Sequence, residues 1–118
     1  MTTLDMGACG EEAAKNYLLQ NGFTIRNTNW RWGHKELDIV AVKGQTLHVV
    51  EVKTRTVNSL IDPLASVNRQ KQRNTLFAAN AYMRCFGLNY EVQMDIIVVI
   101  VNGNNSEITY IPAAYYPC

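Results

Sequence analysis

The sequence has little net charge, few cysteines and no long apolar segment, and each shortage excludes a class of protein. With 11 Lys and Arg against 10 Asp and Glu, the chain is not a polycation that coats nucleic acid by bulk charge alone. Its three cysteines are widely spaced and form no CxxC or Cys/His cluster, which argues against a zinc site and fits a reducing cytoplasm. The longest apolar run extends only from Ile96 to Val101, whereas a membrane span needs about 20 residues.

What remains is the composition of a globular domain. The 118 residues are 47% hydrophobic and 18% charged, which provides enough apolar material for a core and too little charge for a disordered chain. Residues 1–5 lack the basic and apolar regions of a signal peptide, and the sequence contains no repeat or linker. We therefore expect a single cytoplasmic domain over residues 1–118, with no membrane partner.

Hydrophobic periodicity and turn residues predict two helices and five strands. The expected helices cover residues 5–21 and 64–86, and the expected strands cover 23–28, 37–42, 46–53, 90–101 and 108–111. Residues 43–45 are a hairpin signal, residues 29–35 and 54–65 are expected loops, and Asp62-Pro63 is the expected start of the second helix. This order predicts an α/β domain in which helices flank a mixed central sheet.

Charged residues occur in two of the expected strands that are otherwise apolar. Glu51 and Lys53 lie among valines and point to the same face, because side chains alternate along a strand. If the preceding strand pairs with this one through the turn at Gly44, Asp38 lies close to Glu51. A buried charge is costly unless it is paired or binds a metal, so these residues call for a chemical explanation.

A divalent cation would remove the conflict between the two carboxylates, which otherwise repel each other. Mg²⁺, or Mn²⁺ in its place, takes one or two carboxylates together with waters and substrate phosphate, so Asp38 and Glu51 are candidate ligands. Lys53 would orient or deprotonate an attacking water, or stabilise the charged transition state of phosphoryl chemistry. The alternative is that Glu51 and Lys53 form an ordinary ion pair on an exposed sheet face.

Positive charge is concentrated in the middle of the chain. Residues 53–84 contain six cations and one carboxylate, a net charge of +5 in a chain whose total is +1. This asymmetry indicates a phosphate-contacting face, although an ordinary solvated helix face is the alternative. The candidate nucleic-acid-binding residues are Arg31, Arg55, Arg69, Lys71 and Arg73.

Several motifs, in this order, resemble the UPF0102 (YraN-like) family over about residues 7–100. The matching residues are Gly7-x-x-Gly10-Glu11-x-x-Ala14, Asn29-Trp30-Arg31, Glu36-Leu37-Asp38-Ile39-Val40, Val50-Glu51-Val52-Lys53-Thr54-Arg55, Lys71-Gln72-Arg73 and Asp95. That family resembles the PD-(D/E)xK nuclease superfamily and is similar in layout to archaeal Holliday-junction resolvases. The resemblance implies a restriction-endonuclease-like core of order α-β-β-β-α-β, here followed by an extra C-terminal strand.

The resemblance also implies a site and a reaction. Asp38 and Glu51 would bind the metal, and Lys53 would be the catalytic lysine. The Val52 carbonyl and the helix-borne Glu11 would complete the ligand set. The implied reaction is hydrolysis of phosphodiester bonds in nucleic acid, DNA more than RNA and including branched or damaged DNA, by a homodimer.

The chain departs from the family's pattern at three places. Lys35 stands where Gly is usual, Val49 replaces an aromatic residue, and Gln93-Met94 replaces Arg-Phe before Asp95. None of these removes a proposed ligand, but the missing Arg weakens any phosphate contact near Asp95. Two further functions stay open: a module of the same fold that binds nucleic acid without cutting it, and an interaction protein whose carboxylates form internal salt bridges.

Overall fold

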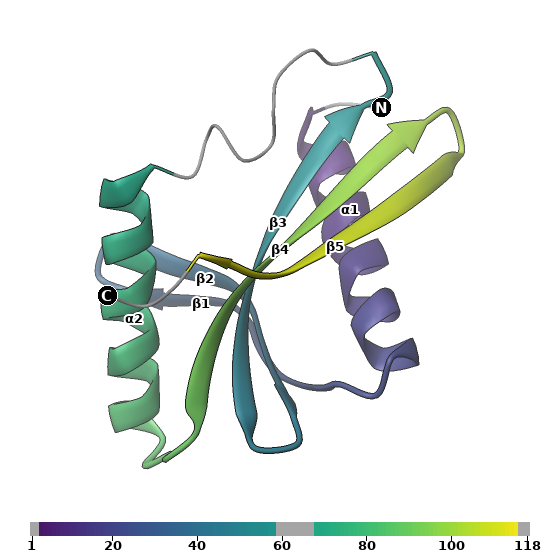
Figure 1. The fold of residues 1–118 in the computed structure, drawn as a ribbon. Coiled ribbons are helices and arrows are strands. Elements are labelled where there is room, and N and C mark those ends of the chain that lie inside the picture. The colour runs from purple at the N-terminus through teal and green to yellow at the C-terminus, as the bar shows by residue number, and fades with distance from the viewer. Residues whose placement is uncertain (1–2, 59–67, 116–118) are drawn as a thin grey trace.

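A mixed sheet of five strands, in the order β1-β2-β3-β4-β5, runs through the centre of the molecule (Figure 1). The computed structural model describes residues 3–58 and 68–115. The elements are α1 (Thr3–Gln20), β1 (Thr24–Trp32), β2 (Lys35–Lys43), β3 (Thr46–Thr56), α2 (Arg69–Cys85), β4 (Glu91–Asn102) and β5 (Asn105–Tyr115). The predicted α/β class and the order α-β-β-β-α-β-β are confirmed.

Strand β3 occupies the middle of this sheet and joins its two halves. Strands β1, β2 and β3 form an antiparallel meander, whereas β3 and β4 are parallel, with Glu51 opposite Ile96 and Lys53 opposite Val98. A parallel pair needs a long crossover connection, which here contains α2. The antiparallel pair of β4 and β5 completes the sheet.

The two helices cover opposite faces of the sheet, because alternate residues of the central strands pack against different helices. On one face, Ala14 and Leu18 of α1 pack in one core cluster with Val50 of β3. On the other face, Ala79 and Tyr82 of α2 pack in a second cluster with Val49, the preceding residue of the same strand. The core residues of the α1 face are Phe23, Ile39, Ala41, Val50, Ile97 and Val99, and those of the α2 face are Leu37, Val40, Leu47, Val49 and Met94.

The expected loop over residues 29–35 is wrong. Strand β1 continues to Trp32, and the chain turns at Gly33 before β2 begins at Lys35. Trp30 lies opposite Leu37 and packs edge-on against Tyr82 of α2, with 5.1 Å between the ring centroids. Aromatic residues favour strands, and here tertiary packing of Trp30 outweighs the loop signal of the neighbouring Gly.

Boundaries of three other elements also differ from the expectation. Strand β3 extends to Thr56, so the expected loop over 54–65 begins later, and β5 is longer at both ends than the predicted 108–111. Helix α2 begins at Arg69, where the side chain of Asn68 accepts a hydrogen bond from Lys71 N at 2.9 Å as an N-cap. The expected helix start at Asp62-Pro63 lies outside the described residues.

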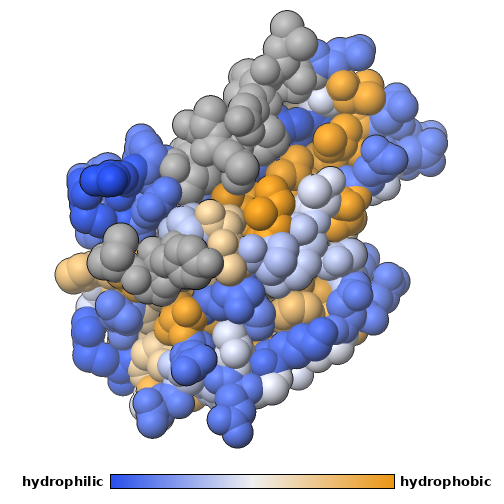
Figure 2. All heavy atoms as spheres, in the orientation of Figure 1, coloured by the Kyte–Doolittle hydropathy of each residue, from blue (hydrophilic) through white to orange (hydrophobic). Residues whose placement is uncertain are grey.

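Apolar side chains gather in a band on the face of the molecule shown in Figure 2, over β4 and β5. In this part of the sheet Ile96 and Val98 are buried, and Ile100 and Ile111 are partly buried against them. None of the described helices is both long enough and apolar enough to cross a membrane.

Helix α1 approaches β3 so closely at Gly10 that replacing this glycine should destabilise the protein. A Cβ at Gly10 would lie 2.0 Å from Oγ1 and 3.1 Å from Cβ of Thr54. We expect Gly10→Ala to cost about 1–3 kcal/mol through overpacking, measured as the free energy of unfolding in urea. Gly7→Ala is the matched control, because nothing lies within 4 Å of its Cβ and alanine favours the helix by up to about 1 kcal/mol. Equal effects of the two substitutions would contradict this account.

Candidate functional site

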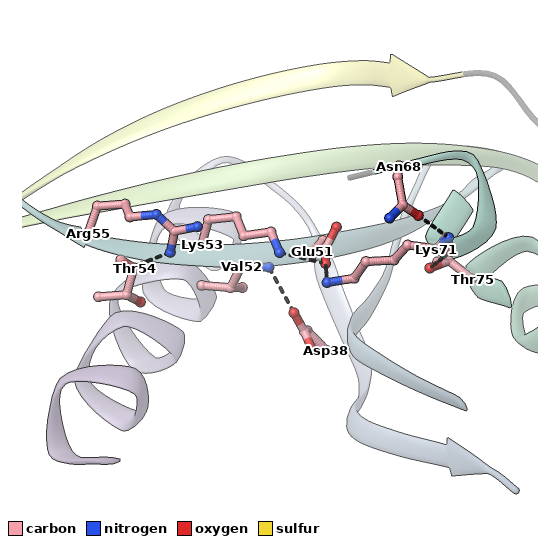
Figure 3. A network of polar contacts seen from close by, with 9 residues as sticks. All are labelled: Asp38, Glu51, Val52, Lys53, Thr54, Arg55, Asn68, Lys71 and Thr75. Carbon is pink, nitrogen blue, oxygen red and sulfur yellow. Dashed lines mark hydrogen bonds and ion pairs between the residues drawn. The ribbon is translucent and has the colours of Figure 1, made fainter. Parts of the chain in front are cut away.

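The candidate site lies where strands β2 and β3 separate. Their regular pairing extends from the hairpin at Gly44 as far as Ile39 opposite Val50 and then stops. At the next position the Asp38 side chain takes the place of a backbone partner, because its Oδ2 accepts a hydrogen bond from Val52 N at 2.9 Å (Figure 3). The separation of the two strands leaves a cleft whose wall carries the Asp38 carboxylate.

The cleft contains a cavity of about 310 Å³ that gathers most of the predicted site. Asp38 reaches it from β2, Glu51 and Lys53 reach it from β3, and Lys71 reaches it from the first turn of α2. Figure 3 shows the side chains of Glu51, Lys53 and Lys71 pointing toward one another. The hairpin prediction that placed Asp38 near Glu51 is therefore confirmed.

Glu51 is shared between two ammonium groups. Lys53 Nζ lies 3.0 Å from Glu51 Oε1, and Lys71 Nζ makes an ion pair with the same oxygen. The side chains of Glu51 and Lys53 are only 10% and 11% exposed, whereas that of Lys71 is 44% exposed. The ion pair of the alternative interpretation is thus present, but it lies in a buried cleft and not on an exposed sheet face.

The buried position of these groups changes their acidity. Burial raises the pKa of Asp38 to about 6, and the nearby negative charge of Glu51 adds to this, while the hydrogen bond from Val52 N acts in the opposite direction. Burial lowers the pKa of Lys53, with a further contribution from the neighbouring Lys71, although Glu51 opposes it. A carboxyl that resists ionisation beside an amine that gives up its proton more readily is typical of a functional site.

The donor set of the cleft fits a small, hard divalent cation. Glu51 Oε2 is buried and has no hydrogen-bond partner among the described residues, so it offers a free lone pair where an unsatisfied oxygen is costly. Asp38 supplies a second carboxylate in the same cavity. Among residues 3–58 and 68–115 no three His, Cys, Asp or Glu side chains form a ready metal cluster. Mg²⁺ takes one or two carboxylates and keeps several waters, so Asp38 and Glu51 are sufficient as its protein ligands.

Glu11 lies on the other side of Asp38. Together with Val52 and Asp38 it lines a neighbouring hollow between α1 and β3, and its Oε1 accepts a hydrogen bond from Asn29 Nδ2 at 2.7 Å. The sequence interpretation assigned no role to Asn29. This residue adopts a positive φ of 52° in β1, a conformation that Asn tolerates better than most residues. It lies in the strand between Thr28, which is opposite Ile39, and Trp30, which is opposite Leu37.

The predicted nucleic-acid-binding residues differ in their exposure and in their relation to the cavity. Arg31 is exposed and lies 3.5 Å from Glu36, which lines the cavity, while Arg55 is half-buried and donates to Thr54 O at 2.9 Å. Arg69 and Arg73 are exposed on α2, and Arg73 donates to Gln70 Oε1 at 3.0 Å. Lys71 is the member of the set that enters the cavity itself.

A second buried polar cluster surrounds Asp95, on the α1 face of the sheet. Its carboxylate lies 2.6 Å from His48 Nδ1 and accepts hydrogen bonds from Tyr110 OH at 2.7 Å and from the backbone N of Ala113 at 2.9 Å. Gln93 donates a hydrogen bond to the same carboxylate at 2.9 Å. Asp95 is 1% exposed, so this cluster is a structural junction of β3, β4 and β5 and not a phosphate contact.

Asp95→Asn is expected to destabilise the protein at neutral pH. Burial raises the pKa of Asp95, but its hydrogen bonds outweigh burial, and the pKa lies below its ordinary value. A carboxylate with a lowered pKa stabilises the folded state above its unfolded pKa, and this contribution is lost as the pH falls. Asparagine would place an NH₂ among donors, at a cost of about 1.5–3 kcal/mol or more in urea unfolding at pH 7. The exposed Glu107→Gln on β5 serves as control, and an equally small effect of both would refute the prediction.

The fold is an α/β sheet covered by a helix on each face, and the site combines two carboxylates and a lysine at the fork of two strands. The model of the Uncharacterised protein family UPF0102 matches residues 10–99, and the chain belongs to this family. It is 44% identical to a UPF0102 protein of Parabacteroides distasonis over 115 aligned residues. The aligned region covers 97% of this chain and 95% of the relative. It is 45% identical over 113 residues to one of Bacteroides thetaiotaomicron, covering 96% and 93%.

Proposed function

We propose that this protein is a metal-dependent nuclease that hydrolyses phosphodiester bonds in DNA, including branched or damaged DNA. The observation that carries the proposal is the cavity at the fork of β2 and β3, where Asp38, Glu51 and Lys53 meet. The buried oxygen of Glu51 without a hydrogen-bond partner among the described residues supports a cation at this place. DNA as the preferred nucleic acid, and a homodimer as the acting form, belong to the same proposal.

Each residue has a distinct part in the proposed reaction. Asp38 and Glu51 would hold a Mg²⁺ or Mn²⁺ ion, with the Val52 carbonyl and Glu11 completing its surroundings. When bound, the ion would neutralise charge on the scissile phosphate and activate the attacking water. Lys53, whose pKa is lowered by burial, would accept a proton from this water or donate a hydrogen bond to the phosphate.

The cations around the cavity would bring the substrate to the site. Arg31, Arg69 and Arg73 are exposed and would contact the phosphodiester backbone, which carries no sequence information but sets register and orientation. Because each neutralised phosphate releases counterions, binding should weaken steeply as the salt concentration rises.

The proposal is tested by a cleavage screen with Mg²⁺ and with Mn²⁺. The substrates are linear, nicked, flapped and four-way DNA and the matching RNAs, and the wild type is compared with Lys53→Ala and Asp38→Ala. Metal-dependent cleavage that both variants lose is the expected result. No cleavage of any substrate by a protein that binds Mg²⁺ would contradict the proposal.

The alternative of an interaction protein with internal salt bridges has one observation in its favour. Glu51 is already neutralised by Lys53 and Lys71, as it would be in a site built only from salt bridges. Salt-dependent DNA binding without turnover would instead favour a module that binds nucleic acid without cutting it. Absence of both cation and nucleic-acid binding at low salt would favour an interaction protein.

A further inference from the structure

Lys71 reaches the proposed metal site from the first turn of α2, a helix that also carries the exposed Arg69 and Arg73. Its ammonium forms an ion pair with Glu51 Oε1, the same oxygen that Lys53 contacts at 3.0 Å. The ammonium groups of Lys53 and Lys71 therefore balance the carboxylates of Glu51 and Asp38, and the charges of Lys35 and Glu36, which also line the cavity, cancel each other. Adding a divalent cation to this set, with no other change, would leave two positive charges in excess in a largely buried space.

One of the two lysines must therefore move when a cation binds Glu51, because an excess of like charge at short range in a buried site is strongly unfavourable. Lys53 is held within β3, and its side chain is 11% exposed. Lys71 lies at the beginning of α2, its side chain is 44% exposed, and its flexible stem allows the ammonium to turn toward solvent. Lys71 is therefore the lysine whose ammonium moves away from Glu51 when a cation binds.

The helix that carries Lys71 bears further positive charge. Arg69 and Arg73 are exposed on it and share one face because they are four residues apart, whereas Lys71, two residues from each, projects from another face. A substrate phosphate at the mouth of the cavity would give the released ammonium a new partner. In the metal-free protein, by contrast, the same ammonium is engaged by Glu51 and is less available to nucleic acid.

We propose that Lys71 couples cation binding to nucleic-acid binding: it is the counter-ion of Glu51 in the metal-free protein and transfers to a substrate phosphate when a divalent cation binds. This inference rests on the proposed function, since it requires Glu51 to be a metal ligand. Coupling is reciprocal, so the cation raises the affinity for DNA by the same factor by which DNA raises the affinity for the cation. Lys71 is on this view a positioning residue and not a catalytic one.

The test compares Lys71→Gln with Arg73→Gln, which removes the same charge from the same helix without touching Glu51. Mg²⁺ is titrated into each DNA-free protein by calorimetry. Without the competing ammonium, Lys71→Gln should bind Mg²⁺ about tenfold more tightly, within the usual range of such couplings, while Arg73→Gln keeps the wild-type affinity. Unchanged affinity in Lys71→Gln would overturn the inference.

The coupling itself is measured as DNA affinity with and without Mg²⁺, by fluorescence anisotropy of a short duplex shown on a gel to be uncut. Mg²⁺ should raise the DNA affinity of the wild type and of Arg73→Gln by about tenfold and that of Lys71→Gln by much less. Lys71→Arg keeps the charge and should restore the coupling, which a purely structural role of this position would not predict. Equal coupling in all four proteins would overturn the inference.

Failure of the inference and failure of the proposed function give different results. In one case the wild type binds Mg²⁺, Asp38→Asn abolishes this binding, and Lys71→Gln has the same Mg²⁺ affinity as the wild type. This result would support the metal site and refute the coupling. If neither the wild type nor Lys71→Gln binds Mg²⁺, the proposed function fails and the coupling with it.

Discussion

Replacing Lys53 with methionine should reduce cleavage by about a thousandfold, because proton transfer and charge stabilisation at a reacting group each contribute about 10²–10⁴-fold. The Lys53 side chain is only 11% exposed. Methionine keeps most of its aliphatic stem and removes only the ammonium. The variant should fold and should still bind Mg²⁺, because Asp38 and Glu51 are unchanged. Single-turnover cleavage of the best substrate, followed with saturating enzyme, measures the effect on the chemical step.

Lys43→Met is the matched control for this substitution. Lys43 lies at the other end of the same hairpin, is exposed, and stacks over the ring of Phe23 at 5.0 Å. It should leave cleavage within about twofold of the wild type, since surface changes away from the site are nearly neutral. If Lys53→Met cleaved at the same rate as Lys43→Met, Lys53 would have no part in the chemistry.

Asp38→Asn should abolish cleavage and at the same time stabilise the metal-free protein at neutral pH. The folded pKa of Asp38 is raised from 3.8 to about 6, so the unfolded chain loses this proton at lower pH than the folded chain does. Stability contributed by the protonated group is therefore lost as the pH rises between these values. Above pH 6 the buried carboxylate costs the folded state about 3 kcal/mol, and asparagine removes this cost while still accepting from Val52 N.

The measurement is urea unfolding without metal at pH 4 and at pH 7.5. The variant should gain about 1–3 kcal/mol over the wild type at pH 7.5 and little at pH 4, where Asp38 is protonated in the folded protein and only partly ionised in the unfolded chain. Mg²⁺ should stabilise the wild type and not the variant, because binding to the folded state alone raises stability. A variant less stable than the wild type at pH 7.5 would contradict the pKa argument, and Asp95→Asn is expected to show that opposite sign.

Local sequence signals are sufficient to predict the order of the elements and the part of the site that lies on the β2–β3 hairpin. Gly44 marks the hairpin that joins β2 and β3, and the alternation of side chains then puts Asp38, Glu51 and Lys53 in one place. These inferences needed only the period of a strand and a short turn, and both are properties of neighbouring residues.

Contacts between distant segments were not predictable in this way. The ion pair of Lys71 with Glu51 depends on where the crossover places the first turn of α2, and the bond from Asn29 to Glu11 depends on how α1 packs near β1. Trp30 was misassigned to a loop for the same reason, because its strand is stabilised by packing against Tyr82. In each case the determining partner is far away in sequence.

The parallel pairing of β3 with β4 has a consequence for the order in which this site can form. Thr46 pairs with Glu91, so the ladder that supports Glu51 and Lys53 closes only after the whole crossover has been brought back to the sheet. Pairings of such high sequence separation form slowly, whereas the β2–β3 hairpin is local. During folding the carboxylates of Asp38 and Glu51 should therefore meet, with only Lys53 of the same hairpin beside them, before Lys71 arrives to complete the ion pairs of Glu51.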